Sequence, residues 1–381
     1  MKKGKQLETL MDQTFHYNFE KMTDYHGAGW FIDFNYNLLC RFDYNSGSIS
    51  VEDYLPAHNA LNIQYRRMVL YKDFFVMVPF NSTGILIYNI KEKKCQELKL
   101  ESSYMEYGVA RLSNAFVYKN KIFFIPGRYQ AIVCLDMDSY KLHYITNEVE
   151  QIINMPSHTR QRAIFSQGVA AVENMLYIPL WQCACLLALD MDLLSGKLIK
   201  INIKEGLWAI CKEDNGGFLI SAREKSRFLR FTLNNNAVQE LLFERDHARI
   251  DEMGYSELIQ VDSGYIAIPA KGNQILWLNP DFNQCRVIYQ FDFKYINGVQ
   301  KYAFADRTFV GCTEYNKNLY MCSQYEGMIL AINLEDFHVR KISTEYPLTK
   351  EIFKQLWPPA NSENAIRESR LRDLESFLEN I

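Results

Sequence analysis

The sequence predicts an all-β fold, namely a β-propeller with seven four-stranded blades. Three observations lead to this prediction. Two apolar runs separated by a short polar segment recur along most of the chain, and the repeat has the length of a propeller blade. Tyrosine and phenylalanine number 24 each, and aromatic side chains favour strands over helices. Turn-forming segments such as 214–217 and 262–264 fall at equivalent places in different repeats.

Each repeat is clearest at an apolar run that ends in proline. Four repeats show this run at 75–79, 123–126, 177–179 and 265–269, and three weaker ones without the proline lie at 30–33, 218–221 and 319–322. Proline has no N–H to donate, so it ends a strand where the chain leaves the sheet. The runs end at positions 33, 79, 126, 179, 221, 269 and 322, which are 42 to 53 residues apart. A β-sandwich or a pair of barrels does not require this regularity, so the ring of blades is the favoured architecture.

The pattern resembles kelch and YVTN-type bacterial propeller repeats over about residues 28–345. The paired glycines of kelch blades are missing, as are the Gly-His and Trp-Asp dipeptides of WD-type blades. The resemblance therefore implies an architecture and no family function.

Residues 28–345 form the predicted propeller, and the segments on either side differ from it. Within the N-terminal segment 1–27, residues 13–22 could supply a strand that closes the ring, which leaves six or eight blades as alternatives to seven. The tail 346–381 has apolar residues at helical spacing from Ile366 to Ile381. We expect one amphipathic helix that packs on the propeller, with a dimerising or partner-binding helix as the alternative. A second short helix is expected at 147–155.

Composition limits the classes of partner. The formal net charge of −3 provides no basic field for a phosphate backbone, so nucleic-acid binding is not expected. No run approaches the roughly 18 apolar residues of a membrane-spanning helix, so no membrane contact is expected either. The nine cysteines are scattered without framework spacing. They are interpreted as free thiols in a reducing compartment, which predicts a cytoplasmic location.

The known catalytic signatures are missing. The sequence contains no sialidase box, no Gly-x-Ser-x-Gly, no phosphate-binding glycine loop and no histidine pair at zinc-ligand spacing. Cys183 and Cys185 could in principle serve a soft metal, but they are interpreted as two small residues on one face of a strand. We therefore expect a protein without cofactor or metal, and a non-catalytic role is favoured.

In a propeller, the connections between second and third strands lie together on one face near the central channel. Here these connections mix aromatic rings with amides and arginines, which suits a peptide or a glycan-like ligand. The predicted ligand-binding residues are Tyr36, Phe80, Asn81, Arg128, Tyr129, Trp181, Gln182, Arg223, Glu224, Lys271, Tyr325 and Glu326. The favoured function is a non-catalytic intracellular recognition module that binds a peptide, protein or glycan-like ligand on this face.

Two alternatives belong to other functional classes. The first is a hydrolase or lyase acting on a carbohydrate, with Glu224, Glu326 or Asp33 as acid or base at the channel mouth. It requires two carboxylates within about 5 to 9.5 Å of each other. The second is a structural scaffold that assembles subunits through blade edges and the C-terminal helix.

Overall fold

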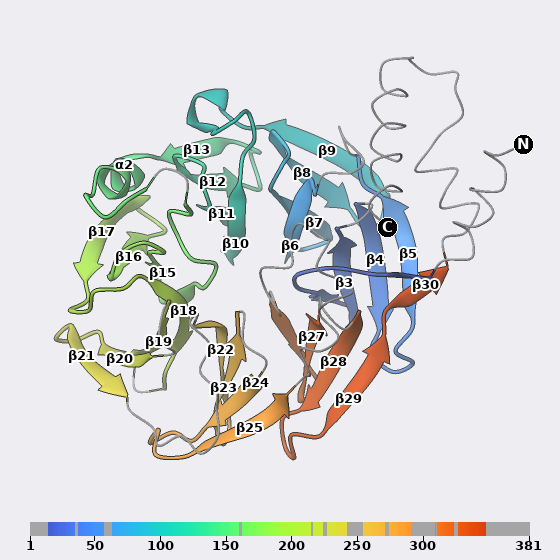
Figure 1. Cartoon of the computed structure of the whole chain (residues 1–381). Helices are drawn as coiled ribbons and strands as arrows, with labels where there is room; N and C mark the ends of the chain where they lie inside the picture. Colours follow the sequence, from blue (N-terminus) through green and yellow to red (C-terminus); the bar gives the residue numbers. More distant parts are fainter. Residues whose placement is uncertain are drawn as a thin grey trace, which may run out of the picture.

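The computed structural model describes residues 14–34, 37–56, 63–159, 162–214, 216–223, 227–241, 254–270, 274–290, 309, 311–323 and 327–347. Within these residues, seven four-stranded antiparallel sheets are arranged in a ring around a central axis (Figure 1). The strands of each sheet follow one another in chain order. The fold is therefore a seven-bladed β-propeller, as the seven repeats predict.

Every blade uses the same four strand positions. The innermost strands are β2 (Thr23–Tyr25), β6 (Tyr65–Tyr71), β10 (Leu112–Tyr118), β14 (Ala170–Val172), β18 (Leu207–Lys212), β22 (Tyr255–Val261) and β26 (Cys312–Tyr315). The second strands are β3 (Ala28–Asp33), β7 (Phe74–Pro79), β11 (Lys121–Pro126), β15 (Met175–Pro179), β19 (Phe218–Ala222), β23 (Gly264–Pro269) and β27 (Asn318–Ser323). The third strands are β4 (Leu38–Asp43), β8 (Gly84–Asn89), β12 (Ile132–Asp136), β16 (Cys185–Asp190), β20 (Phe228–Thr232), β24 (Gln274–Leu278) and β28 (Met328–Asn333). The outermost strands are β5 (Ile49–Tyr54), β9 (Lys94–Lys99), β13 (Leu142–Ile145), β17 (Ser195–Lys200), β21 (Ala237–Leu241), β25 (Cys285–Gln290) and β29 (Val339–Ser343).

The predicted repeat corresponds to the second strand of every blade. Asp33, Pro79, Pro126, Pro179 and Pro269 end their strands, and positions 221 and 322 lie one residue before the strand end. Because innermost and second strands are antiparallel, the innermost strands begin at the edge where the second strands end. We call this edge of the ring the loop face.

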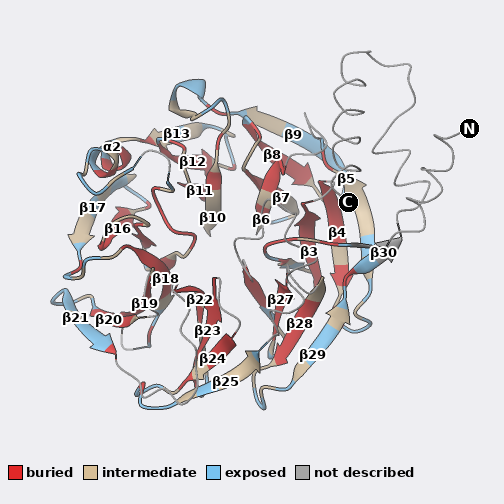
Figure 2. Cartoon of the chain, in the orientation of Figure 1, coloured by how far each residue is buried: buried red, intermediate tan, exposed pale blue. Residues whose placement is uncertain are grey.

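The core lies between the blades. Figure 2 shows buried residues concentrated on the inner three strands, while the outermost strands carry most of the exposed ones. On β11, Ile122 and Phe124 pack in a cluster with blade 2, and Phe123 and Ile125 pack in a cluster with blade 4. Alternate side chains of one strand thus bury against both neighbouring blades, which explains the uninterrupted apolar runs.

The Asp or Asn that ends the third strand has a local structural role. The Oδ1 atom of Asp136 accepts the N–H groups of Asp138 and Ser139, and Asp190 makes the same turn with Asp192 and Leu193. Asp43, Asn89 and Asn333 do so in blades 1, 2 and 7. These side-chain turns reverse the chain into the outermost strand. They account for the recurrent acidic or amide residue.

The two ends of the described chain meet beside blades 1 and 7. Strand β1 (Thr14–His16) pairs with β30 (Glu345–Pro347) in a separate two-stranded sheet, whereas all four strands of blade 7 come from the C-terminal part of the chain. The segment 13–22 thus supplies a strand, but this strand pairs with β30 and not with a blade.

A short helix, α2 (Asn147–Ile153), occurs where one was expected, and a 3-10 turn spans Ser102–Tyr104. The helix predicted within 346–381 lies outside the described residues. Among the described residues, no helix has the length and apolar character needed to cross a bilayer.

Candidate functional site

Four innermost strands carry a β-bulge near the loop face. The pairing register shifts between Tyr65 and Arg67, between Leu112 and Asn114, between Leu207 and Ile210, and between Tyr255 and Glu257. Bulges redirect side chains and often occur beside functional sites. Here Arg67, Asn114 and Glu257 follow the bulges and line a cavity at the axis.

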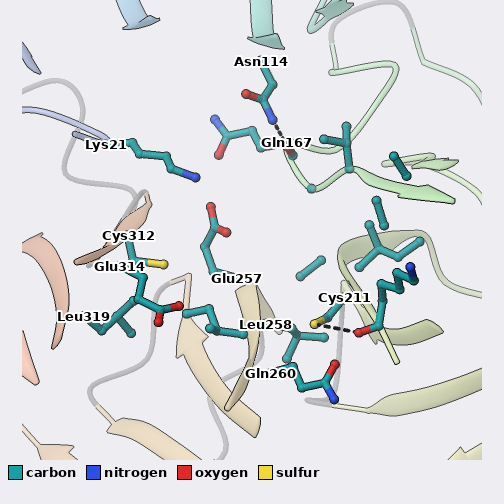
Figure 3. A pocket seen from close by; sticks show the side chains of 18 of the residues that line it. Lys21, Asn114, Gln167, Cys211, Glu257, Leu258, Gln260, Cys312, Glu314 and Leu319 are labelled. Atoms are coloured by element: carbon teal, nitrogen blue, oxygen red, sulfur yellow. Dashed lines mark hydrogen bonds between the residues drawn. The ribbon is translucent and has the colours of Figure 1, made fainter. Parts of the chain in front are cut away.

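The axial cavity has a volume of about 410 Å³. Figure 3 shows Lys21 extending toward its centre from the left and Glu257 from below, with Asn114 and Gln167 above them. Small and apolar residues of the innermost strands, among them Ala170 and Ala209, complete the wall. Charges of both signs line the cavity, so it does not select for the sign of a ligand.

Arg67 links three parts of the ring at this cavity. Its Nε lies 2.6 Å from Oε2 of Glu20, and its Nη2 donates to Oε1 of Gln167 at 3.2 Å. Oε1 of Glu257 lies 3.8 Å from the same Nη2. Burial by itself would lower the pKa of Arg67, but Glu20 and Glu257 outweigh it and the pKa is raised. Arg67 therefore stays charged and holds the cavity wall together.

A second group of cations lies on the loop face, around the half-buried ring of Phe80. The guanidinium carbons of Arg66 and Arg111 lie 4.5 and 4.7 Å from the ring centroid, and Arg128 forms an ion pair with Glu106 at 3.9 Å. We call Arg66, Arg111 and Arg128 the arginine cluster. Arg66 also forms an ion pair with Glu20.

The backbone fixes Arg111 in place. Its N–H donates to the carbonyl of Phe80 at 3.0 Å, and its own carbonyl accepts the N–H groups of Gly127 and Arg128. Its φ of 50° lies in the left-handed region, which non-glycine residues adopt mainly where surrounding contacts enforce it. Arg111 is thus clamped between the loops of blades 2 and 3.

The charge of the Arg111 guanidinium lies in an unfavourable environment. Burial lowers its pKa, and the positive charges of Arg128 and Arg66 lower it further. Within the described part of the chain, it makes neither a hydrogen bond nor an ion pair. Its guanidinium lies over the face of Phe80, and the carboxylate of Glu106 offsets the unfavourable effects only in part. Such a group gains most from an anion brought by a ligand.

Trp181 and Arg223 form a second aromatic and cationic pair on this face. The ring of Trp181 contacts the buried Trp208 edge to face, with 4.4 Å between the ring centroids. The guanidinium carbon of Arg223 lies 5.7 Å from the centroid of the Trp181 ring. Gly206 permits this arrangement, because a Cβ at that position would lie 1.9 Å from the carbonyl oxygen of Trp181. Trp181 is half-buried and contributes ring surface to the loop face.

Four of the predicted ligand-binding residues have half-buried side chains on the loop face, namely Phe80, Arg128, Trp181 and Arg223. Asn81 is also half-buried there, and its N–H donates to the carbonyl of Ile63. The residues Tyr36, Glu224, Lys271, Tyr325 and Glu326 lie outside the described residues.

Tyr129 and Gln182 have structural roles that the sequence did not indicate. Tyr129 is 0% exposed, and its hydroxyl donates to the carbonyl of Glu101 at 2.8 Å, so its ring belongs to the core and not to the loop surface. Gln182 bonds to the N–H and hydroxyl of Thr159 and to the carbonyl of Ala163. Its amide thereby anchors the long connection between blades 3 and 4.

Sequence reasoning missed Arg66 and Arg111. It considered only the connections that leave the second strands, whereas these arginines lie where innermost strands begin. The signal that could have found them is their place next to Tyr65 and Leu112, the first residues of β6 and β10. The start of an innermost strand lies at the same edge of the ring, the loop face, as the end of the second strand.

One of the three carboxylates named for the enzymatic alternative has a structural role. Asp33 is 0% exposed, and its Oδ1 accepts the N–H of Asn18 at 2.9 Å. The other two acid or base candidates, Glu224 and Glu326, are not among the described residues. Within those residues, no group of three or more His, Cys, Asp or Glu side chains is arranged to hold a metal.

Comparison with known proteins shows the fold alone. No family model and no curated protein sequence matches the chain. Virginiamycin B lyase from Staphylococcus aureus is similar in structure, with a TM-score of 0.59, 13% identity, and coverage of 82% of this chain and 95% of that one. YCF48 bound to D1 peptide gives a TM-score of 0.57 at 8% identity, covering 84% and 94%. Hsv2 from Kluyveromyces lactis gives 0.53 at 9%, covering 87% and 98%.

Proposed function

We propose that this protein is a non-catalytic recognition module whose loop face binds a peptide or glycan-like ligand through a carboxylate. The observation that carries the proposal is Arg111, a guanidinium held against Phe80 between two other arginines. Glu106 compensates its charge only in part, and a carboxylate matches the paired N–H groups of a guanidinium. Trp181 and Arg223 extend the surface with a second ring.

One structural neighbour supports a binding role for this fold. YCF48, whose similarity extends over 84% of this chain, was solved with a bound peptide. Aromatic rings beside arginines supply rigid contact area together with directed hydrogen bonds, which is typical of peptide-binding surfaces. An intracellular location is part of the proposal, and the nine free cysteines support it.

The enzymatic alternative receives less support. Asp33 is committed to the core, so a reaction at the channel mouth would depend on Glu224 and Glu326. In the cavity, Glu257 lies within ion-pair distance of Arg67. A scaffold role would depend chiefly on the predicted C-terminal helix, which is not among the described residues.

The test is a binding screen with peptides and glycans offered in matched pairs, with and without a carboxylate. We expect the wild-type protein to select carboxylate-bearing probes. Arg111→Gln should weaken binding roughly 10- to 150-fold, because a charged hydrogen bond contributes about 1.5–3 kcal/mol. Trp181→Ala should weaken binding of probes long enough to reach the second pair.

Arg286→Gln is the matched control. Arg286 also lies over an aromatic ring, that of Phe337 at 5.8 Å, but on the outermost strand β25. It should leave affinity unchanged. The proposal fails if folded Arg111→Gln and Trp181→Ala proteins bind like the wild type, or if the wild type makes no distinction between the members of a pair.

A further inference from the structure

The axial cavity has the size of a small-molecule site. Its volume of about 410 Å³ lies within the range of about 300–1,000 Å³ that is usual for pockets enclosing small ligands. The space exists because β14 and β18 present small residues to the axis, with Gly168, Ala170 and Ala209 in the wall. No residue of the arginine cluster is among the described residues that line this wall. The cavity is therefore separate from the arginine cluster.

In the described part of the chain, one positive charge of this cavity has no counter-ion. Lys21 extends toward the centre (Figure 3), and its ammonium group makes neither a hydrogen bond nor an ion pair with a described residue. The chain is held on both sides of Lys21. Glu20 forms the buried ion pair with Arg67, and the carbonyl of Met22 accepts the hydroxyl of Thr313 at 2.7 Å. The ammonium group is thus directed into the cavity before any ligand arrives.

One negative charge lies in a comparable position. Glu257 follows the β-bulge of β22, and its carboxylate also extends into the cavity. Its Oε1 lies 3.8 Å from Nη2 of Arg67, which is too far for a hydrogen bond. The Nε and Nη2 atoms of Arg67 donate to Glu20 and Gln167 instead. Glu257 accepts no hydrogen bond from the described residues, so its carboxylate can accept donors from a ligand.

The other charges of the wall balance each other. Glu20 compensates Arg67, and the exposed Lys212 and Glu314 contribute one charge of each sign. Lys212 ends β18 and Glu314 is the third residue of β26, so both lie farther along the axis from the loop face. The ammonium of Lys21 and the carboxylate of Glu257 are therefore the two charges that a ligand can complement.

A ligand with charges of both signs complements this pair best. An anion would be attracted by Lys21 and repelled by Glu257, and a cation would meet the reverse. A zwitterion places its carboxylate at Lys21 and its ammonium at Glu257, and each contact is a charged hydrogen bond. Apolar side chains, among them Leu258 and Leu319, also line the cavity and suit an apolar substituent on the ligand.

We propose that the axial cavity binds a free α-amino acid with an apolar side chain. Lys21 binds the α-carboxylate, and Glu257 binds the α-ammonium group. Within the described residues no ion pair joins Lys21 to Glu257, and the two charged groups of an α-amino acid, attached to one carbon, bridge them. This site does not depend on the carboxylate-binding function proposed for the loop face.

The test is isothermal titration calorimetry of the full chain with alanine, valine, leucine and methionine. We expect binding of at least one of these amino acids at a single site. Its N-acetyl derivative lacks the ammonium group, and its amide lacks the carboxylate. Each derivative should bind roughly 10- to 150-fold more weakly than the free amino acid, because each loses one charged hydrogen bond.

Two variants locate the site. Lys21→Met and Glu257→Gln should each weaken binding of the amino acid by a similar factor. Lys21→Met should then bind the amino acid and its amide equally, because the contact with the carboxylate is already lost. Lys94→Met and Glu92→Gln are the matched controls, since they change the same residue types in an exposed ion pair of blade 2. They should bind like the wild type, and circular dichroism verifies that every variant is folded.

Arg111→Gln separates this site from the loop face, because an amino acid also carries a carboxylate. This variant should keep full affinity for the amino acid. Binding that is lost in Arg111→Gln and kept in Lys21→Met would place the ligand at the arginine cluster and overturn the cavity site. The proposal also fails if the N-acetyl derivative binds as tightly as the free amino acid, or if the wild type binds none of the four.

Discussion

The carboxylate of Glu20 and the guanidinium of Arg67 form an ion pair inside the ring, with Oε2 and Nε 2.6 Å apart. Glu20 belongs to the segment that precedes blade 1, and Arg67 belongs to the innermost strand of blade 2. The Glu20 side chain is fully buried, and it also pairs with Arg66. One carboxylate thus compensates the buried Arg67 and the half-buried Arg66.

Removing Glu20 should therefore be costly. Glu20→Ala leaves both guanidinium groups without that compensation, and we expect a loss of about 3–5 kcal/mol in the free energy of unfolding. Chemical denaturation measures it. Glu92→Ala is the control, because Glu92 pairs with Lys94 on the exposed surface and should cost at most about 1 kcal/mol. A loss from Glu20→Ala as small as that of the control would show that the pair does not hold this part of the ring.

Tyr129 should affect stability and not recognition. Its hydroxyl donates to the carbonyl of Glu101, so Tyr129→Phe should lower the free energy of unfolding by about 0.5–1.5 kcal/mol. Binding of a carboxylate probe should stay unchanged, because the ring is 0% exposed. Phe80→Leu, in contrast, removes the platform under Arg111 and should weaken binding. Equal effects of both variants on affinity would contradict this separation of roles.

Gly206 should control the position of Trp181. In Gly206→Ala the new Cβ would lie 1.9 Å from the Trp181 carbonyl oxygen, so the loop must move. We expect a loss of about 1–3 kcal/mol in stability and a shifted tryptophan emission spectrum. Lys204→Ala, an exposed change in the same connection, serves as the control. An unshifted spectrum with wild-type stability would argue against the close approach.

Alkylation of Cys185 should depend on pH in a distinctive way. The neighbouring Cys183 and the positive charge of Lys200 lower the pKa of Cys185, so its thiolate forms at a lower pH than that of an ordinary cysteine. Cys183→Ala removes this influence on Cys185 and should slow alkylation at pH 7. Cys95, whose pKa burial raises to about 11, should remain slow in both proteins. Peptide mass spectrometry follows each site, and a Cys185 profile centred at the pH of an ordinary cysteine would contradict the lowered pKa.

The fold could be predicted from the sequence because each blade repeats the same pattern of strand burial and turn formation. The second strand is buried on both faces, as Phe123 and Phe124 illustrate, so its apolar run is continuous and easy to find. The side chain of Asp136 makes a turn that must recur wherever the third strand ends. Both features depend on residues that are close together in the sequence, so the sequence pattern predicts them.

The candidate site was only partly predictable, because its residues meet through long-range placement. The loop position of Phe80 followed from the repeat, but Arg111 reaches it from the connection before the next blade, whose length varies. Tyr129 was predicted to be exposed because it follows the end of a strand. Its hydroxyl instead donates to the carbonyl of Glu101, 28 residues earlier, and its ring is buried. The periodicity of the strands predicts neither the approach of Arg111 to Phe80 nor the burial of Tyr129.

The junction of the two ends of the described chain has a consequence for biosynthesis. Strand β1 can pair only once β30 has left the ribosome, and the hydroxyl of Thr313 in blade 7 donates to the carbonyl of Met22, next to Lys21 at the cavity. A nascent chain that lacks blade 7 therefore carries an open ring in which Met22, next to Lys21, lacks its contact with Thr313. The axial cavity, whose wall includes Cys312 and Glu314 of blade 7, is then completed in a single late step of translation and not blade by blade.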